Sequence, residues 1–161
     1  MLTMIISPPV PSRRHAADPG APPPATGASA GRRAAADALF ATPILVVEDE
    51  SMIAWMIENV LLDAGFTSVD MAATGEDAEQ IAATARPGLI ISDVNLGAGK
   101  DGIAAATAIR AASALPVIFV TAYADPAMRD RVAAALPGAQ LLRKPVDEAV
   151  LLRAVMRALG N

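Results

Sequence analysis

The sequence contains no cysteine, and its 161 residues include a single histidine, His15. The absence of cysteine excludes disulfide bonds and thiolate metal sites. Aromatic residues make up only 3% of the chain, so its core must be built mainly from Ala, Val, Ile and Leu. No apolar run approaches the roughly 20 residues that span a bilayer, and a net charge of −4 lacks the basic surplus of nucleic-acid-binding domains. We expect a soluble, cytoplasmic protein that binds neither nucleic acid nor membrane.

The first 40 residues differ in composition from the rest. Proline recurs at residues 8–11 and 22–24, and small residues follow from Ala25 to Ala36 without apolar periodicity. Such a segment buries too little surface to offset its ordering entropy. No apolar region follows the arginine pair Arg13-Arg14, so we expect no export signal. Residues 1–40 are predicted to be a disordered tail that carries His15 without a catalytic role, and residues 43–160 a single folded domain.

From Pro43 onward, strand and helix patterns alternate regularly. The strand patterns are apolar at consecutive positions, as at Leu89, Ile90 and Ile91, which is typical of a sheet covered on both faces. Five repeats of strand then helix predict an α/β fold, a doubly wound five-stranded parallel sheet of order 2-1-3-4-5. The expected strands are residues 43–47, 66–72, 89–93, 116–121 and 139–143. The expected helices are residues 51–64, 74–85, 102–112, 125–136 and 146–159.

Charged and polar side chains follow the strand patterns where the strands end. Glu48 and Asp49 follow the first strand, Asp93 the third and Lys144 the fifth, while Thr121 ends the fourth. The carboxyl ends of parallel strands meet at one crevice, where ligands bind. Three carboxylates there favour Mg²⁺, which prefers oxygen ligands. The lysine and the threonine hydroxyl suit phosphoryl oxygens, and a carboxylate can accept a phosphoryl group. The sequence therefore predicts phosphoryl transfer to Asp93.

Four short motifs carry these residues in a fixed order: residues 46–50 (Val-Val-Glu-Asp-Glu), 92–95 (Ser-Asp-Val-Asn), 120–122 (Val-Thr-Ala) and 143–145 (Arg-Lys-Pro). Together they resemble the ordered signature of response-regulator receiver domains, over residue 43 to the C-terminus. This resemblance implies a flavodoxin-like, CheY-like fold. It also implies phosphorylation of Asp93 by a sensor histidine kinase or a histidine phosphotransfer protein.

The resemblance further assigns roles around Asp93. It implies Mg²⁺ bound by Asp49, Asp93 and the backbone carbonyl of Asn95, with Glu48 acting through water. It implies that Lys144 and Thr121 contact the phosphoryl oxygens. The peptide bond between Lys144 and Pro145 is typically cis in this family.

Three positions depart from the family pattern. Gly97 stands where a proline is usual, in a glycine-rich loop over residues 96–102 that is one residue longer than usual. Because glycine enlarges the set of accessible conformations, we expect a more mobile acceptor loop. Leu141 stands where the family usually has an aromatic switch residue. The usual coupling, in which movement of the threonine is accompanied by rotation of an aromatic ring, therefore lacks its ring in this chain. Tyr123 is expected to substitute for that ring or to gate access to the phosphoryl group.

The function expected from these features is a phosphorylation-dependent switch in a two-component system or phosphorelay. Because the chain stops soon after its last helix, we expect a stand-alone receiver without a DNA-binding output domain, and no enzymatic turnover beyond its own phosphorylation and dephosphorylation. Signalling would pass to an output protein through a surface on the last two helices and the fifth strand, at Met128, Val132, Leu141, Val155 and Met156.

Two alternatives remain open at this point. A phosphatase of the haloacid-dehalogenase type also uses an aspartyl nucleophile and Mg²⁺. It needs a second acid two residues after the nucleophile, where this chain has Asn95. The other alternative is a scaffold or sequestering protein with a receiver fold that is never phosphorylated. The complete acid set opposes the scaffold, whereas Leu141 and the unusual loop favour it mildly.

Overall fold

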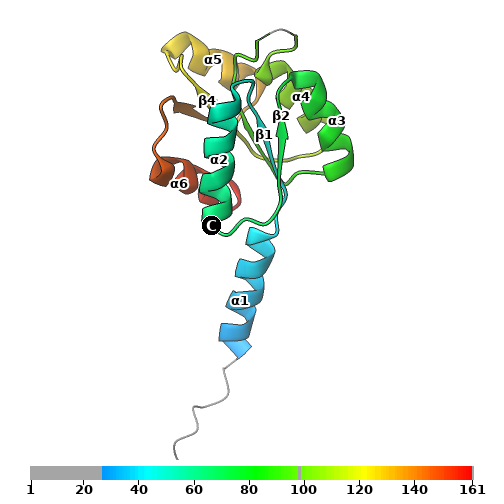
Figure 1. Cartoon of the computed structure of the whole chain (residues 1–161), viewed down its shortest axis with the longest axis vertical. Helices are drawn as coiled ribbons and strands as arrows, with labels where there is room; N and C mark the ends of the chain where they lie inside the picture. Colours follow the sequence, from blue (N-terminus) through cyan, green and yellow to red (C-terminus); the bar gives the residue numbers. More distant parts are fainter. Residues whose placement is uncertain (1–26, 98, 161) are drawn as a thin grey trace, which may run out of the picture.

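The computed structural model describes residues 27–97 and 99–160, and these form a parallel sheet covered by helices (Figure 1). The sheet has five strands in the order β2-β1-β3-β4-β5, which confirms the predicted topology. Neighbouring strands pair in parallel throughout. The strands are β1 (Ile44–Val47), β2 (Val69–Ala72), β3 (Leu89–Ser92), β4 (Val117–Thr121) and β5 (Gln140–Arg143). The helices are α1 (Gly27–Phe40), α2 (Ser51–Asp63), α3 (Gly75–Ala85), α4 (Gly102–Ala112), α5 (Pro126–Ala135) and α6 (Glu148–Ala158).

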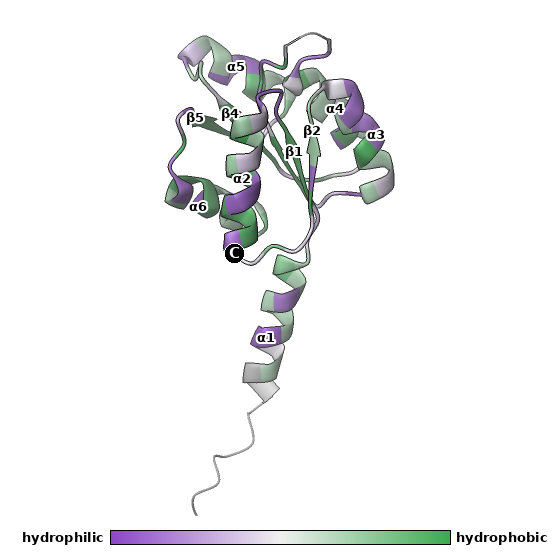
Figure 2. Cartoon of the chain, in the orientation of Figure 1, coloured by the Kyte–Doolittle hydropathy of each residue, from purple (hydrophilic) through white to green (hydrophobic). Residues whose placement is uncertain are grey.

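Two apolar clusters, one on each face of the sheet, make the core. In β1, Leu45 and Val47 belong to one cluster, whereas Ile44 and Val46 belong to the other. This split follows from strand geometry, because successive side chains point to opposite faces. Helices α3, α4 and α5 contribute to the first cluster, and α2 and α6 to the second. Figure 2 shows the central strands as mostly hydrophobic between helices of mixed character, and this two-sided cover explains the consecutive apolar residues of the strands.

Helix α1 differs from the irregular segment that the sequence predicts up to residue 40. Residues 27–40 are helical, because alanine has the highest intrinsic helix propensity and needs no apolar stripe to express it. The helix is joined to the domain at Phe40, whose ring lies 5.3 Å from that of Phe66 in an edge-to-face arrangement. The carbonyl of Phe40 also accepts a hydrogen bond from the Thr67 N–H at 3.0 Å. The predicted disorder of residues 1–26 lies outside the described residues.

Two element boundaries differ from the predicted ones by more than one residue, each for a local reason. Strand β2 begins three residues late because Phe66 turns into the core and Thr67 bonds to the end of α1. Helix α6 begins after Asp147, whose carboxylate accepts hydrogen bonds from the N–H groups of Ala149 and Val150. An N-cap of this kind satisfies donors that the first helical turn leaves unpaired. Within the described part of the chain, no helix has the length and apolar character needed to cross a membrane.

The output surface predicted from the sequence is wrong at two of its five residues. Val132 on α5 is 3% exposed and Val155 on α6 is fully buried, and they lie in the two different core clusters. Because these clusters lie on opposite faces of the sheet, the two valines cannot contribute to one contact surface. The large apolar side chains that are exposed include Met52, Trp55, Met56, Leu62, Met71, Tyr123 and Val150.

Candidate functional site

The acidic residues predicted from the strand ends are brought together at one edge of the sheet. Strands β1 and β3 are adjacent, and the Asp93 N–H donates to the Val47 carbonyl at 2.8 Å, so the residues after both strands stay in register. Each of Glu48, Asp49 and Asp93 offers one carboxylate oxygen, and these three oxygens lie within 4.8 Å of one another. Glu48 and Asp93 are buried, and Asp49 is exposed. The site is therefore an acidic cluster with one side open to solvent.

Lys144 reaches this cluster from the end of β5. Its Nζ atom lies 2.6 Å from Asp93 Oδ2 and 2.7 Å from Glu48 Oε2. The lysine is placed by its own N–H group, which donates to the Thr121 carbonyl at 2.8 Å, and the following Lys144–Pro145 bond is cis. One cation thus faces two buried carboxylates, with a third carboxylate nearby.

The donor set fits a hard divalent cation. Within the described residues, Glu48 Oε2 is buried and completes no directed hydrogen bond, although Lys144 Nζ lies near it. Three carboxylates and one ammonium group leave the cluster with two negative charges in excess. Carboxylate oxygens at this spacing are ligands of the kind that Mg²⁺ and Ca²⁺ prefer. Glu48, Asp49 and Asp93 could therefore hold a metal ion, which would balance the excess charge.

Thr121 lies at the end of β4 as predicted, and it is completely buried. Its Oγ1 atom accepts a hydrogen bond from the Tyr123 N–H at 3.3 Å, which links the threonine to the loop after β4. The Tyr123 side chain is 66% exposed. Leu141 is half-buried, pairs with Phe119 across β4 and β5, and packs on the core cluster. Tyr123 therefore presents its ring to solvent, and Leu141 serves the core.

The loop after Asp93 makes contacts that the side-chain pattern does not reveal. The Asn95 N–H donates to Asp93 Oδ1 at 3.0 Å, in addition to the carbonyl role expected for this residue. The Gly97 N–H donates to Asp49 Oδ2 at 3.0 Å. Gly102 packs so closely that a Cβ there would lie 1.8 Å from the Asp93 carbonyl oxygen. Hydrogen bonds from main-chain N–H groups and close contacts between backbone segments do not depend on side chains. Apart from the glycines, the sequence therefore gives no indication of these contacts.

Electrostatics in the cluster follow from burial and from the shared lysine. Burial raises the pKa of Glu48, and the nearby Asp93 charge adds to this rise, while Lys144 opposes it. Burial by itself would lower the pKa of Lys144, but its close contacts with the Asp93 and Glu48 carboxylates outweigh this effect and raise it. Lys144 is therefore firmly protonated at neutral pH, and Glu48 is held in a site where its charge is costly.

The raised pKa of Glu48 predicts that the stability of the metal-free protein, measured in the presence of a chelator, depends on pH. The folded state keeps this proton to higher pH than the unfolded state, whose value is near 4.5. The free energy of unfolding should therefore fall as pH rises from about 4.5 through the folded pKa of Glu48. Glu48→Gln removes this term, so the variant should be more stable than wild type at pH 7. Urea unfolding between pH 4 and pH 8 measures the difference, and saturating Mg²⁺ should shrink it.

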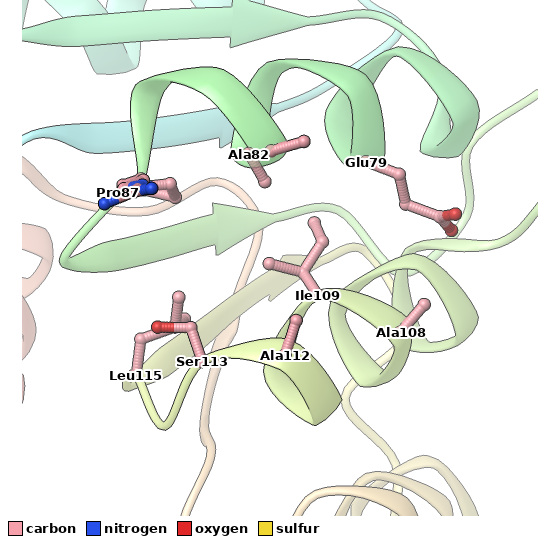
Figure 3. Close-up of a pocket in the computed structure, with 10 residues that line it drawn as sticks. Glu79, Ala82, Pro87, Ala108, Ile109, Ala112, Ser113 and Leu115 are labelled. Atoms are coloured by element: carbon pink, nitrogen blue, oxygen red, sulfur yellow. The ribbon is translucent and has the colours of Figure 1, made fainter.

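A separate groove lies between α3 and α4 and does not contain this chemistry. Its volume is about 450 Å³, and Ala82, Ala108 and Ala112 line it together with Ile109 (Figure 3). Glu79 lies at one end of the groove, where it pairs with Lys100 of the acceptor loop. Among the described residues that line it, the groove has no pair of acids and no nucleophile beside a base, so the candidate functional site is the cluster at the strand ends.

The doubly wound fold and the acidic cluster at its strand ends are those of a receiver domain, and the comparisons place the chain in that family. The model of the response regulator receiver domain matches residues 44–156. The chain belongs to this family, whose members act in two-component signalling.

Two curated relatives and one solved structure illustrate the similarity. The phyllosphere-induced regulator PhyR of Methylorubrum extorquens is 40% identical over 97 residues, which are 60% of this chain and 36% of PhyR. The transcriptional regulatory protein PdtaR of Mycobacterium tuberculosis is 30% identical over 126 residues, or 78% of this chain and 60% of PdtaR. The solution structure of the PhyR receiver domain from Erythrobacter litoralis has a TM-score of 0.65 at 31% identity, covering 74% of this chain and 90% of that one. The chain thus spans between about a third and three fifths of these curated relatives.

Proposed function

We propose that this receiver domain accepts a phosphoryl group on Asp93 in the presence of Mg²⁺ and passes the signal to another protein by direct contact. The donor would be a sensor histidine kinase or a histidine phosphotransfer protein, and the reaction would take place in the cytoplasm. Apart from gaining and losing its own phosphoryl group, the protein would catalyse no reaction.

The observation that carries this proposal is the arrangement around Asp93. One carboxylate oxygen accepts the Asn95 N–H and the other meets Lys144 Nζ at 2.6 Å, with Glu48 and Asp49 beside them. In the transfer, an Asp93 oxygen forms a bond to phosphorus, and the N–P bond of the donor breaks, leaving its electron pair on the imidazole. Lys144 offers positive charge to the phosphoryl oxygens, and Thr121 offers a hydroxyl.

A divalent cation would complete the site. Asp49, Asp93 and the Asn95 carbonyl would hold Mg²⁺, with Glu48 acting through water, and the ion would supply the charge that neutralises the incoming phosphoryl oxygens. The three carboxylates already lie within ligand distance of one another, and Lys144 balances only one of their charges. This excess of negative charge supports a cation at the site.

Tyr123 is the candidate for relaying the change at Asp93. Its N–H is bonded to the Thr121 hydroxyl, which would turn toward a phosphoryl group, and its ring is exposed. Movement of Thr121 would break or shift this hydrogen bond and thereby move Tyr123. Leu141 has no ring that could rotate, and its side chain is packed on the core. Phosphorylation would bias a pre-existing equilibrium between two arrangements of this loop.

The two other functions considered from the sequence are less well supported. Hydrolysis of external substrates by a phosphatase needs an acid two residues after the nucleophile, and Asn95 instead uses its N–H to bind Asp93. An unphosphorylated scaffold would not need Lys144 between two buried acids, because a buried charge network is costly to maintain. We therefore favour the phosphorylated switch.

The proposal is tested by incubating the protein with Mg²⁺ and acetyl phosphate or phosphoramidate and measuring its intact mass. Wild type should gain the mass of one phosphoryl group, and Asp93→Asn should gain none. EDTA should abolish the gain, because the proposed reaction needs the cation. Labelling that persists in the Asp93→Asn variant would remove Asp93 from its proposed role, and labelling that leaves partner binding unchanged would favour a phosphate sink.

A further inference from the structure

We propose that the main-chain N–H of Gly97 is a positioning group for the metal site: it orients Asp49 so that this carboxylate can hold Mg²⁺. The proposal rests on the metal site of the proposed function and adds a residue that the side-chain pattern does not assign. The contact is the hydrogen bond from the Gly97 N–H to Asp49 Oδ2 at 3.0 Å. It joins residues 48 positions apart in the sequence.

Asp49 has particular need of such a contact. It is the exposed member of the acidic cluster, whereas Glu48 and Asp93 are buried and both face Lys144. An exposed carboxylate without a fixed partner samples several rotamers. The Gly97 N–H engages Oδ2 of Asp49, and within the described residues no hydrogen bond occupies the other oxygen, which a cation could therefore use. Groups that orient metal ligands in this way typically change metal affinity by a factor of 10 to 100 when they are removed.

The residue type at position 97 is explained by the same contact. Proline has no N–H and could not make it. A Cβ at this position would lie 3.1 Å from Asp49 Oδ2, so any side chain crowds the carboxylate. Gly97 is not among the glycines with positive φ, so backbone strain does not require glycine here. The close approach to Asp49 favours a residue without a Cβ here, although a small shift of the Asp49 side chain would accommodate one.

The rest of the loop holds Gly97 in place. Its neighbour along the loop, Lys100, donates its N–H to Glu76 Oε1 at 3.2 Å, and its ammonium group pairs with Glu79 on α3. Asp101 caps α4 by accepting the Ala104 N–H at 2.7 Å. These contacts hold the loop on the C-terminal side of Gly97, and the hydrogen bond from the Asn95 N–H to Asp93 Oδ1 holds it on the other side. The loop therefore links the metal ligand Asp49 to helices α3 and α4.

The test compares two substitutions at the same position. Gly97→Pro removes the donor, and Gly97→Ala keeps it while adding a Cβ. Titration calorimetry with MgCl₂ should show Mg²⁺ binding roughly tenfold weaker for Gly97→Pro. Gly97→Ala should lose no more than about threefold, because its neighbour must shift by only a few tenths of an ångström. Thermal unfolding in EDTA checks that both variants are folded.

A second readout follows the hydrogen bond itself. In the ¹H–¹⁵N NMR spectrum of wild type, the Gly97 amide should be protected from hydrogen exchange, and Asp49→Ala should remove that protection. Equal Mg²⁺ affinity in wild type and folded Gly97→Pro would overturn the positioning role while leaving the proposed function intact. Failure of wild type to bind Mg²⁺ would instead count against the proposed function. Weaker binding by Gly97→Ala than by Gly97→Pro would also contradict the role of the donor.

Discussion

Replacing Lys144 with methionine should destabilise the metal-free protein by about 3 kcal/mol at pH 7, because two buried carboxylates lose the cation that both of them contact. The same change should tighten Mg²⁺ binding by about tenfold, since the ion no longer competes with a fixed positive charge in the cluster. Chemical denaturation in EDTA and titration calorimetry measure the two effects. They are expected to have opposite signs, which a general loss of structure could not produce.

Lys144→Arg is the matched control, because it keeps the charge and loses only the compact shape of the ammonium group. Its stability in EDTA should lie much nearer to wild type than that of Lys144→Met. The stability lost by Lys144→Met should return in saturating Mg²⁺, because the ion supplies positive charge to the same carboxylates. Weaker Mg²⁺ binding by Lys144→Met would mean that the lysine organises the cation site instead of competing with the ion.

The second large effect is expected at Gly102. An alanine Cβ here would lie 1.8 Å from the Asp93 carbonyl oxygen and 2.6 Å from Ser92 Oγ. Neither atom can yield easily, because Ser92 and Asp93 are both buried at the end of β3. Gly102→Ala should therefore cost about 3 kcal/mol or more and should also displace Asp93. Denaturant unfolding measures the first consequence, and the rate of labelling by acetyl phosphate measures the second.

Gly31→Ala is the control for adding a methyl group at a glycine. It lies on α1, where a Cβ would have no atom within 4 Å, and alanine is the better helix former. This substitution should leave the unfolding free energy within about 1 kcal/mol of wild type. If Gly102→Ala behaved in the same way, the backbone at Asp93 would have more room than the structure shows.

The strands and most of the site could be predicted because their signals are carried by side chains. Consecutive apolar residues such as Leu89, Ile90 and Ile91 indicate a sheet covered on both faces, and that arrangement places Asp93 at a strand end. Alternating elements fix the strand order, and the strand order brings Lys144 to the acids. The meeting of the acids and the lysine in one crevice was therefore accessible from residue types and their order.

The features that escaped prediction have no such signal. Helix α1 has no apolar stripe, and only the propensity of alanine indicates it. Periodicity cannot assign a helical residue to the core or to a contact surface, which is why Val132 and Val155 were misplaced on the surface. The Gly97 hydrogen bond uses a main-chain donor that every residue except proline possesses. Its importance depends on the position of Asp49, which only the folded chain reveals.

The most direct test of the central claim is to locate the phosphoryl group on wild-type protein that has been phosphorylated by acetyl phosphate in Mg²⁺. Tandem mass spectrometry of its peptides should place the label on Asp93, and hydroxylamine should remove it, as expected of an acyl phosphate. Wild type in EDTA should carry no label. A hydroxylamine-resistant label on a serine or threonine, or the absence of any label with Mg²⁺ present, would contradict the account.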